Sequence, residues 1–381
     1  MGATMSASAD IMAALPGAAR QTPAKTPQRG LLERFAGVIE ACAILVIALL
    51  VSLVLFGVFI AFTGRDPFAV YATIYKGAFG SWFSWQNSLL RAAPIMLTAL
   101  CTALPARAGL VVIGAEGAVV VGGLFAALTG ISLNGAPPLL VISAMMLVAA
   151  GTGGMWVALS GALKHYRGVN ETISSLLLNY IAIAVLNFLV VGMLKDPATL
   201  NKPSTYPVGD ANMLGAIGES SIHWGLVWGV VLCLVLWLVV RRTPFGFSLD
   251  VVGGNVRAAQ VCGLPVGRLV IVACFIGGAA AGLAGAIEVA AVHGRANTSL
   301  NAGYGYAGIL VAFMARHNPL AIIPVAILLG GIRASSGLLQ RVHDLPDATV
   351  LVLQGIIFVV VLASEAYYGR WRWFAAKQER A

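Results

Sequence analysis

Two carboxylates, Glu116 and Glu288, lie inside long apolar stretches of the chain, where ionisable side chains are costly. A carboxylate in hydrocarbon has to face the interior of a helix bundle or a cavity. Glu116 stands between Gly114 and Gly117, and glycines let helix backbones approach closely or let a helix unwind. Two functions therefore stay open for Glu116: it lines a path for a polar solute, or it hydrogen-bonds a neighbouring helix.

Other side chains extend this candidate pathway. Asn179 and Tyr180 lie about one-third of the way into an apolar stretch, where they either hydrogen-bond a solute or join two helices. Glu288 follows a run of small residues, 277–285, that predicts tight packing at the centre of a bundle. Tyr304 either stacks on a ring of a solute or belongs to an interfacial aromatic belt. The candidate pathway residues are Glu116, Asn179, Tyr180, Glu288 and Tyr304.

Residue patterns for covalent or metal chemistry are missing from the sequence. The phosphate loop G-x-x-x-x-G-K-[ST], the zinc motif H-E-x-x-H and the nucleophile motif G-x-S-x-G do not occur. The five histidines stand singly, and the five cysteines form no C-x-x-C pair. We therefore expect no catalytic residue, no metal site and no cofactor.

The elements that position these residues must lie in a membrane. Of the 381 residues, 59% are hydrophobic and 10% are charged, and the mean hydropathy is +0.89. Apolar runs of about 18 residues or more recur, which is the length a helix needs to cross a bilayer, and lipid offers no partners for an open sheet. The expected fold class is an all-α polytopic membrane protein with about ten transmembrane helices. They are 38–62, 87–106, 110–131, 138–163, 172–193, 224–240, 269–292, 304–315, 320–338 and 348–367.

Three regions follow from these spans. The segment 1–36 is rich in Ala, Thr, Pro and Gln without an apolar period, which predicts a disordered cytoplasmic tail. The transmembrane domain covers 37–368, and 369–381 is a second cytoplasmic tail. The first apolar stretch is too long for a signal peptide, so we expect it to stay in the protein. The span at 304–315 is short for a full crossing, which suggests a broken or re-entrant helix.

The basic residues predict the orientation. About 16 of the 24 lysines and arginines fall on the side that holds the N-terminus, which predicts that both termini are cytoplasmic in a multi-pass protein of the bacterial inner membrane. The net charge of +9 indicates this topology and attraction to anionic membrane lipid. Nucleic acid is not an expected partner, because the charges do not gather on one soluble face.

The longest predicted cytoplasmic loop, 241–268, contains a short helix. Gly253, Gly254 and Asn255 form a turn signal, and Asn255 is also a good N-cap for a helix from Val256 to Cys262. The helix carries two small residues, Ala258 and Ala259, and Gly263 ends it. Such a helix on the membrane face suits docking against a partner, although the loop could also be a simple connector.

Four runs of this chain resemble motifs of one family. The run GGNVRAAQVCG, 253–263, resembles the cytoplasmic coupling segment of ABC importer permeases of the branched-chain amino acid, ribose and nucleoside class. The runs at 108–117, at 168–181 and at 303–319 are similar to three other motifs of that class, in its simple-sugar and nucleoside branch. Asp250 and Val256 depart from the pattern, where a basic residue and a proline are expected. Val112, Ala118 and Ala307 also replace polar residues of the pattern.

The resemblance implies partners and a task. It implies a cytoplasmic ATPase subunit that docks on the coupling residues, a second permease subunit (identical or sister) and an extracytoplasmic solute-binding protein. It further implies two pseudo-related halves, a nucleoside, nucleobase or simple sugar as solute, and a permease that is not itself an enzyme. The coupling residues are Gly253, Gly254, Asn255, Ala258, Ala259 and Gly263.

Two alternatives remain on the residues alone. An ion-coupled secondary transporter needs several acidic residues deep in its spans, and only Glu116 and Glu288 qualify. A membrane-embedded enzyme needs His, Asp or Ser groups clustered near one interface, and the sequence has no such cluster.

Overall fold

A computed structural model describes residues 31–199 and 201–365 of the chain. The chain divides into two units, one of residues 45–367 and a smaller one that joins 1–44 with 368–381. Helix α2 (Leu31–Phe62) begins in the smaller unit and ends in the larger one. The predicted tail 369–381 and residues 1–30 of the predicted tail 1–36 lie outside the described residues, and α2 already begins at Leu31.

The larger unit is built from helices, as expected for an all-α protein. Its described residues form no β-strand beyond two isolated bridges. The helices are α3 (Pro67–Phe79), α4 (Trp82–Arg107), α5 (Ala115–Ser132), α6 (Pro138–Arg167), α7 (Glu171–Val191), α8 (Gly225–Arg242), α9 (Pro244–Gly254), α10 (Val256–Val261), α11 (Val266–Ile287), α12 (Tyr304–Met314), α13 (Pro319–Ala334), α14 (Ser336–His343) and α15 (Ala348–Glu365). Three short segments join them: η1 (Asp210–Asn212), the π-helical η2 (Glu288–His293) and η3 (Thr298–Leu300).

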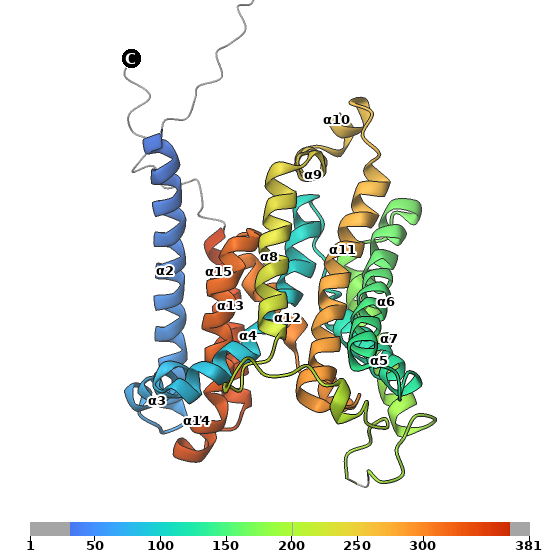
Figure 1. Ribbon diagram of the computed structural model, residues 1–381. Coiled ribbons are helices and arrows are strands. Elements are labelled where there is room, and N and C mark those ends of the chain that lie inside the picture. The colour runs from blue at the N-terminus through green and yellow to red at the C-terminus, as the bar shows by residue number, and fades with distance from the viewer. Residues whose placement is uncertain (1–30, 200, 366–381) are drawn as a thin grey trace, which may run out of the picture. The chain divides into compact units, whose positions relative to one another are not determined.

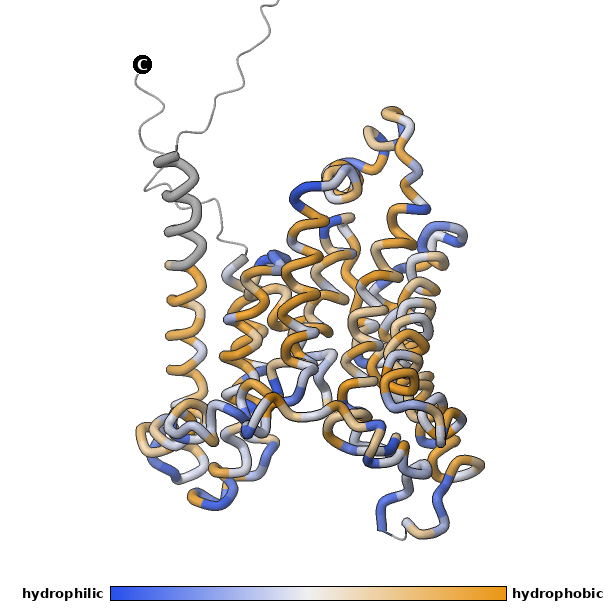
Figure 2. The backbone as a smooth tube through the Cα atoms, in the orientation of Figure 1, coloured by the Kyte–Doolittle hydropathy of each residue, from blue (hydrophilic) through white to orange (hydrophobic). Residues whose placement is uncertain are grey.

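Eight helical stretches of the described residues are long and apolar enough to cross a membrane. Figure 2 shows hydrophobic residues along these helices and hydrophilic residues in the connections at their ends. The protein is therefore a multi-pass membrane protein. The expected number of about ten spans is not confirmed. The apolar part of α15, Ala348–Ser364, is shorter than the other spans, and α12 has 11 residues, which reach roughly half-way through a hydrocarbon core.

Local sequence signals account for several helix ends. The side chain of Asn170 accepts hydrogen bonds from the N–H groups of Thr172 and Ile173 and so begins α7. Gly168 ends α6 in the left-handed conformation, at φ +67°. Asn318 caps α13, and Pro319 occupies its first turn.

Small residues let α11 sit at the centre of the bundle. Gly282 lies against the backbone of Ala149 in α6, and Gly285 lies against that of Val119 in α5. A methyl group at either glycine would overlap the neighbouring backbone. The run 277–285 therefore packs closely, as the sequence predicts.

The helix contacts follow a reciprocal pattern between α4–α7 and α11–α15. Helix α4 packs on α12 and α13, and α11 packs correspondingly on α5 and α6. The second helices of the two sets, α5 and α12, also touch each other. Two related halves would pack in this way, although their relation stays a prediction. Figure 1 shows α9 and α10 beyond one end of α8 and α11, and α3 beside α14 at the opposite end.

Candidate functional site

A non-helical segment, 108–114, separates α4 from α5 near Glu116. Gly109 turns the chain in the left-handed conformation, at φ +78°, and the helix resumes only at Ala115. Backbone groups of such a break need partners, because a membrane interior supplies none. The break replaces the first residues of the span predicted at 110–131.

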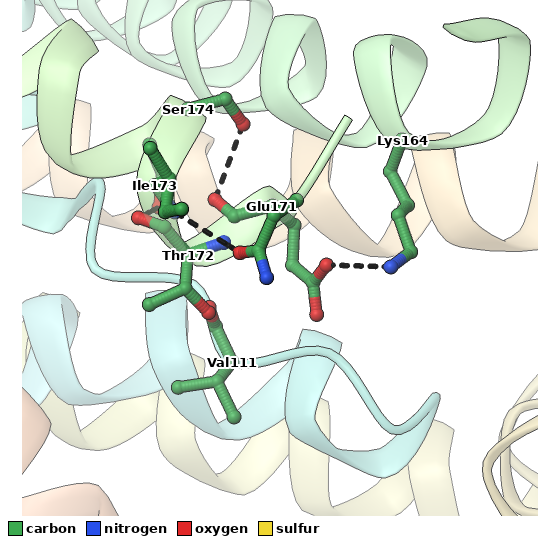
Figure 3. Close-up of polar contacts among 8 residues, drawn as sticks. Val111, Lys164, Glu171, Thr172, Ile173 and Ser174 are labelled. Atoms are coloured by element: carbon green, nitrogen blue, oxygen red, sulfur yellow. Dashed lines mark hydrogen bonds and ion pairs between the residues drawn. The ribbon is translucent and has the colours of Figure 1, made fainter. Parts of the chain in front are cut away.

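Side chains of α7 supply these partners. Asn179 donates from Nδ2 to the Ile113 carbonyl and accepts from the Gly117 N–H, each at 2.7 Å. Ser175 Oγ accepts from the Ile113 N–H at 3.0 Å. Thr172 donates to the Val111 carbonyl at 2.8 Å, and Figure 3 shows the Thr172 side chain next to Val111. These three α7 residues share one helix face, and they hold the break along its length.

Asn179 and Tyr180 therefore lie in different surroundings. The Asn179 side chain is fully buried and engaged with backbone, whereas Tyr180 is 59% exposed in the isolated chain. The structure brings Asn179 towards Glu116 through Gly117 and leaves Tyr180 on the outer face of α7. Of the two alternatives open for Asn179, its contacts are those of a residue that joins helices.

Glu116 caps the N-terminus of α12 from across the bundle. Its Oε1 accepts from the Gly303 N–H at 2.7 Å, and its Oε2 accepts from the Gly305 N–H at 2.5 Å. The carboxylate is fully buried. Helix α12 has no side-chain cap of its own, and a negative charge at a helix N-terminus is stabilising. Glu116 thus fixes the place where α12 begins.

Arg333 of α13 holds the same turn from the other side. Its guanidinium donates to the carbonyls of Ala302 and Gly303. The guanidinium carbon also lies 4.9 Å from the ring centre of Tyr304, in cation–π geometry. Thr98 of α4 donates to the Tyr304 carbonyl at 2.9 Å. The start of α12 is therefore clamped by α4, α5 and α13.

Glu288 and Tyr304 line one polar pocket, whose volume is about 610 Å³. Glu288 opens the π-helical segment η2, and π-helical turns are frequent at functional sites. Its carboxylate lies 3.7 Å from Nε2 of His293. Arg91 of α4 and Asn301 also line this pocket, which we call the outer pocket after the predicted orientation of the chain. Both signs of charge and several amides and hydroxyls therefore face the same space.

The loop 241–268, which we call the coupling loop after its predicted role, forms two helices. Helix α10 runs over Val256–Val261, and Asn255 caps it by accepting from the Ala258 N–H at 3.0 Å, which confirms the predicted short helix. Helix α9 precedes it and ends with Gly253 and Gly254, which the sequence indicated as a turn. Gly263 ends α10 in the left-handed conformation, at φ +76°.

Some of the predicted coupling residues serve packing within this chain. Ala259 is fully buried, in the same cluster as Leu249 and Val252 of α9, whereas Ala258 is exposed. Gly253 lies directly on the Arg107 carbonyl, so a side chain there would not fit. The surface open to a partner includes four of the predicted coupling residues, Gly254, Asn255, Ala258 and Gly263, together with Val261, which is 84% exposed.

An ion pair connects the coupling loop to the break. Arg107 donates to both carboxylate oxygens of Asp250, at 2.9 and 2.6 Å. Arg107 is the last residue of α4, directly before the non-helical segment. A second pair lies near the start of α7, where Lys164 Nζ is 2.9 Å from Glu171 (Figure 3).

In the described part of the chain, no three His, Cys, Asp or Glu side chains gather in a way that could hold a metal ion. The sequence analysis did not predict that Arg333, Thr172 and Ser175 belong to this site. Arg333 carries the stronger signal, since an arginine at the end of an apolar run needs a polar partner. Serine and threonine on an apolar helix give no such signal, because they also bond within their own helix.

The sequence matches a family model described as "branched-chain amino acid transport system / permease component" over residues 84–362. A glucose ABC transporter permease protein of Haloferax volcanii is 28% identical over 338 residues, which cover 86% of this chain and 88% of that protein. A guanosine ABC transporter permease protein of Bacillus subtilis is 28% identical, with 84% and 92% covered. A nucleoside ABC transporter permease protein of Lactococcus lactis is 24% identical, with 78% and 85% covered.

Proposed function

Because this chain belongs to the family of branched-chain amino acid transport system permease components, we propose that it is the membrane-spanning permease of an ABC importer. Three relatives that cover most of the chain are named as ABC permeases for glucose, guanosine and nucleosides. The solute is then a small polar molecule such as a nucleoside, nucleobase or simple sugar. The chain is a transport subunit of the inner membrane and not an enzyme.

The outer pocket is the proposed entry to the pathway. It lies between α4, η2 and the turn before α12, and Glu288, Tyr304 and Asn301 offer hydrogen bonds to a hydroxyl-rich solute. Glu116 belongs to the pathway indirectly, because it fixes the turn that carries Tyr304. The turn before α12, which α4, α5 and α13 hold in place, is called the clamped turn below. Alternating access would require it to move between two positions.

The exposed face of α9 and α10 is the proposed dock for the ATPase subunit. This face carries apolar side chains that no described part of the chain covers, among them Phe247 and Val261, which are 69% and 84% exposed. Arg257 lies one helical turn before Val261 on α10 and adds an exposed positive charge to that helix. An exposed apolar patch of this kind at the end of the bundle suits a protein partner. The observation that carries the proposed dock is the exposed apolar surface of α9 and α10 in a chain that belongs to a permease family.

Two further partners belong to the proposal. A solute-binding protein delivers the solute at the opposite end, where the outer pocket opens. A second permease, either another copy or a sister subunit, completes the pathway. Many apolar side chains of the spans are exposed in the single chain, so lipid or a second subunit covers them.

Substitution of Val261 tests the dock. We expect Val261→Glu to abolish co-purification of the ATPase subunit that assembles with this permease, because a charge replaces the most exposed apolar side chain of α10. Val342→Glu is the matched control, since Val342 is 56% exposed on α14 at the other end of the bundle. Retention of the ATPase by the Val261 variant would place the dock elsewhere.

A further inference from the structure

A second pocket lies on the other side of the clamped turn. It has a volume of about 650 Å³ and lies between α12 and α15. Asn301 and Ala302 line both this pocket and the outer pocket, so the two spaces meet at that turn. We refer to the second space as the inner pocket.

The walls of the inner pocket are apolar. Ile309 and Leu310 of α12 face Leu351 and Phe358 of α15 across it, and Ile113 of the break closes one side. Phe358 is held edge-on by Phe313, with ring centres 6.1 Å apart. These walls suit the faces of a flat ring. A sugar would lose hydrogen bonds to water here, because its hydroxyls point in all directions.

One amide in the inner pocket lacks a partner. Gln354 of α15 lines the pocket with a side chain that is only 8% exposed, and its Nε2 makes no hydrogen bond within the described residues. A buried unpaired donor destabilises a protein, and a lipid chain could not relieve it because it offers no acceptor. A solute with an acceptor on its edge would relieve it after a rotation of the flexible side chain.

The geometry points to Gln354 as a specificity-determining residue that binds an acceptor on a planar heteroaromatic ring of the solute in the inner pocket. This inference rests on the proposed function. A purine meets both requirements, because its faces are apolar and its edge carries acceptors such as N7. The turn at Asn301 then separates the outer pocket, which would take the hydroxyl-bearing part of the solute, from the inner pocket, which would take its ring.

The test uses Gln354→Leu in the complex reconstituted with the ATPase subunit and the solute-binding protein that work with this permease. ATP-dependent uptake of labelled guanosine and ribose is measured in the same vesicles, together with the melting temperature of the purified permease. We expect guanosine uptake to fall roughly tenfold, the effect of one lost hydrogen bond in a site built for it, with little change for ribose. The melting temperature should stay equal or rise, since leucine removes an unpaired polar group.

Gln340→Leu is the matched control, because Gln340 is an exposed glutamine on α14. Guanosine uptake that survives in Gln354→Leu would overturn the inference, as would an equal loss of guanosine and ribose uptake. Failure of the wild-type complex to take up guanosine while it takes up ribose would also overturn it and leave the proposed function standing. If the wild-type complex took up no solute although the ATPase bound, the proposed function would fall as well.

Discussion

Glu116 joins two elements that lie far apart in the chain, and its removal should therefore destabilise the fold. Glu116→Gln keeps one oxygen for the two N–H groups of Gly303 and Gly305 and removes the charge that favours the start of α12. We expect a loss of about 1–3 kcal/mol in the free energy of unfolding, measured by denaturation in detergent.

Glu219→Gln serves as the control for this substitution, because Glu219 is an exposed carboxylate in the connection before α8. Unchanged stability of the Glu116 variant would mean that the carboxylate does not cap α12 in the folded protein.

His317 should make stability depend on pH. It lies outside the spans, between α12 and α13, where burial lowers its pKa and the positive charges of Arg107 and Arg316 act in the same direction. As pH falls, the unfolded chain protonates this histidine before the folded chain does. The stability that neutral His317 contributes is therefore fully present above about pH 6.5 and is lost progressively below it. We expect thermal stability to fall from pH 7 to pH 5, and His317→Gln to reduce this slope. Parallel curves for the two proteins would contradict the assignment.

At the scale of elements, the break at 108–114 depends on α7. Asn179→Leu removes the partners of the Ile113 carbonyl and the Gly117 N–H and leaves both buried groups unpaired. Each unpaired group costs roughly 1–3 kcal/mol. We expect the amides of 113–117 to exchange hydrogen faster than in the wild type, measured by mass spectrometry of peptides.

Tyr180→Phe is the control for this element, because it changes an exposed neighbour on the same helix. Equal exchange in the Asn179 variant and the wild type would show that the break is held by other contacts.

The elements that sequence analysis predicted correctly carry local signals. Asn255 before α10 and Gly263 after it are such signals, and the shortness of α12 followed from its span length. Helix α9 was missed because its glycines indicate a turn, whereas Leu249 and Val252 hold it by burial against the bundle. The break before α5 is likewise set by Asn179, which lies more than sixty residues away in the chain.

At the scale of the whole larger unit, one chain of contacts links the coupling loop to the outer pocket. Asp250 of α9 holds Arg107 at the end of α4, and the break that follows leads to Glu116. Glu116 in turn fixes the start of α12, where Tyr304 lines the outer pocket. A shift of α9 and α10 on binding the ATPase subunit would therefore act on the clamped turn through contiguous contacts.

This linkage requires the coupling loop and the outer pocket to face opposite sides of the membrane, and a native cysteine can test that. Cys262 is exposed beside α10, whereas Cys101, Cys233 and Cys274 are buried. Because the basic residues predict that the loop is cytoplasmic, a membrane-impermeant maleimide should label Cys262 in inverted vesicles and not in intact cells with a permeable outer membrane.

Two variants make the labelling specific. Cys262→Ser should remove the signal from inverted vesicles. Glu219→Cys in that background places a cysteine in the exposed connection before α8, so it should react in intact cells. Labelling of Cys262 from outside, or of the Glu219 variant only from inside, would reverse the orientation. The dock on α10 would then face away from the cytoplasm, where ATP is hydrolysed, and the importer proposal could not hold.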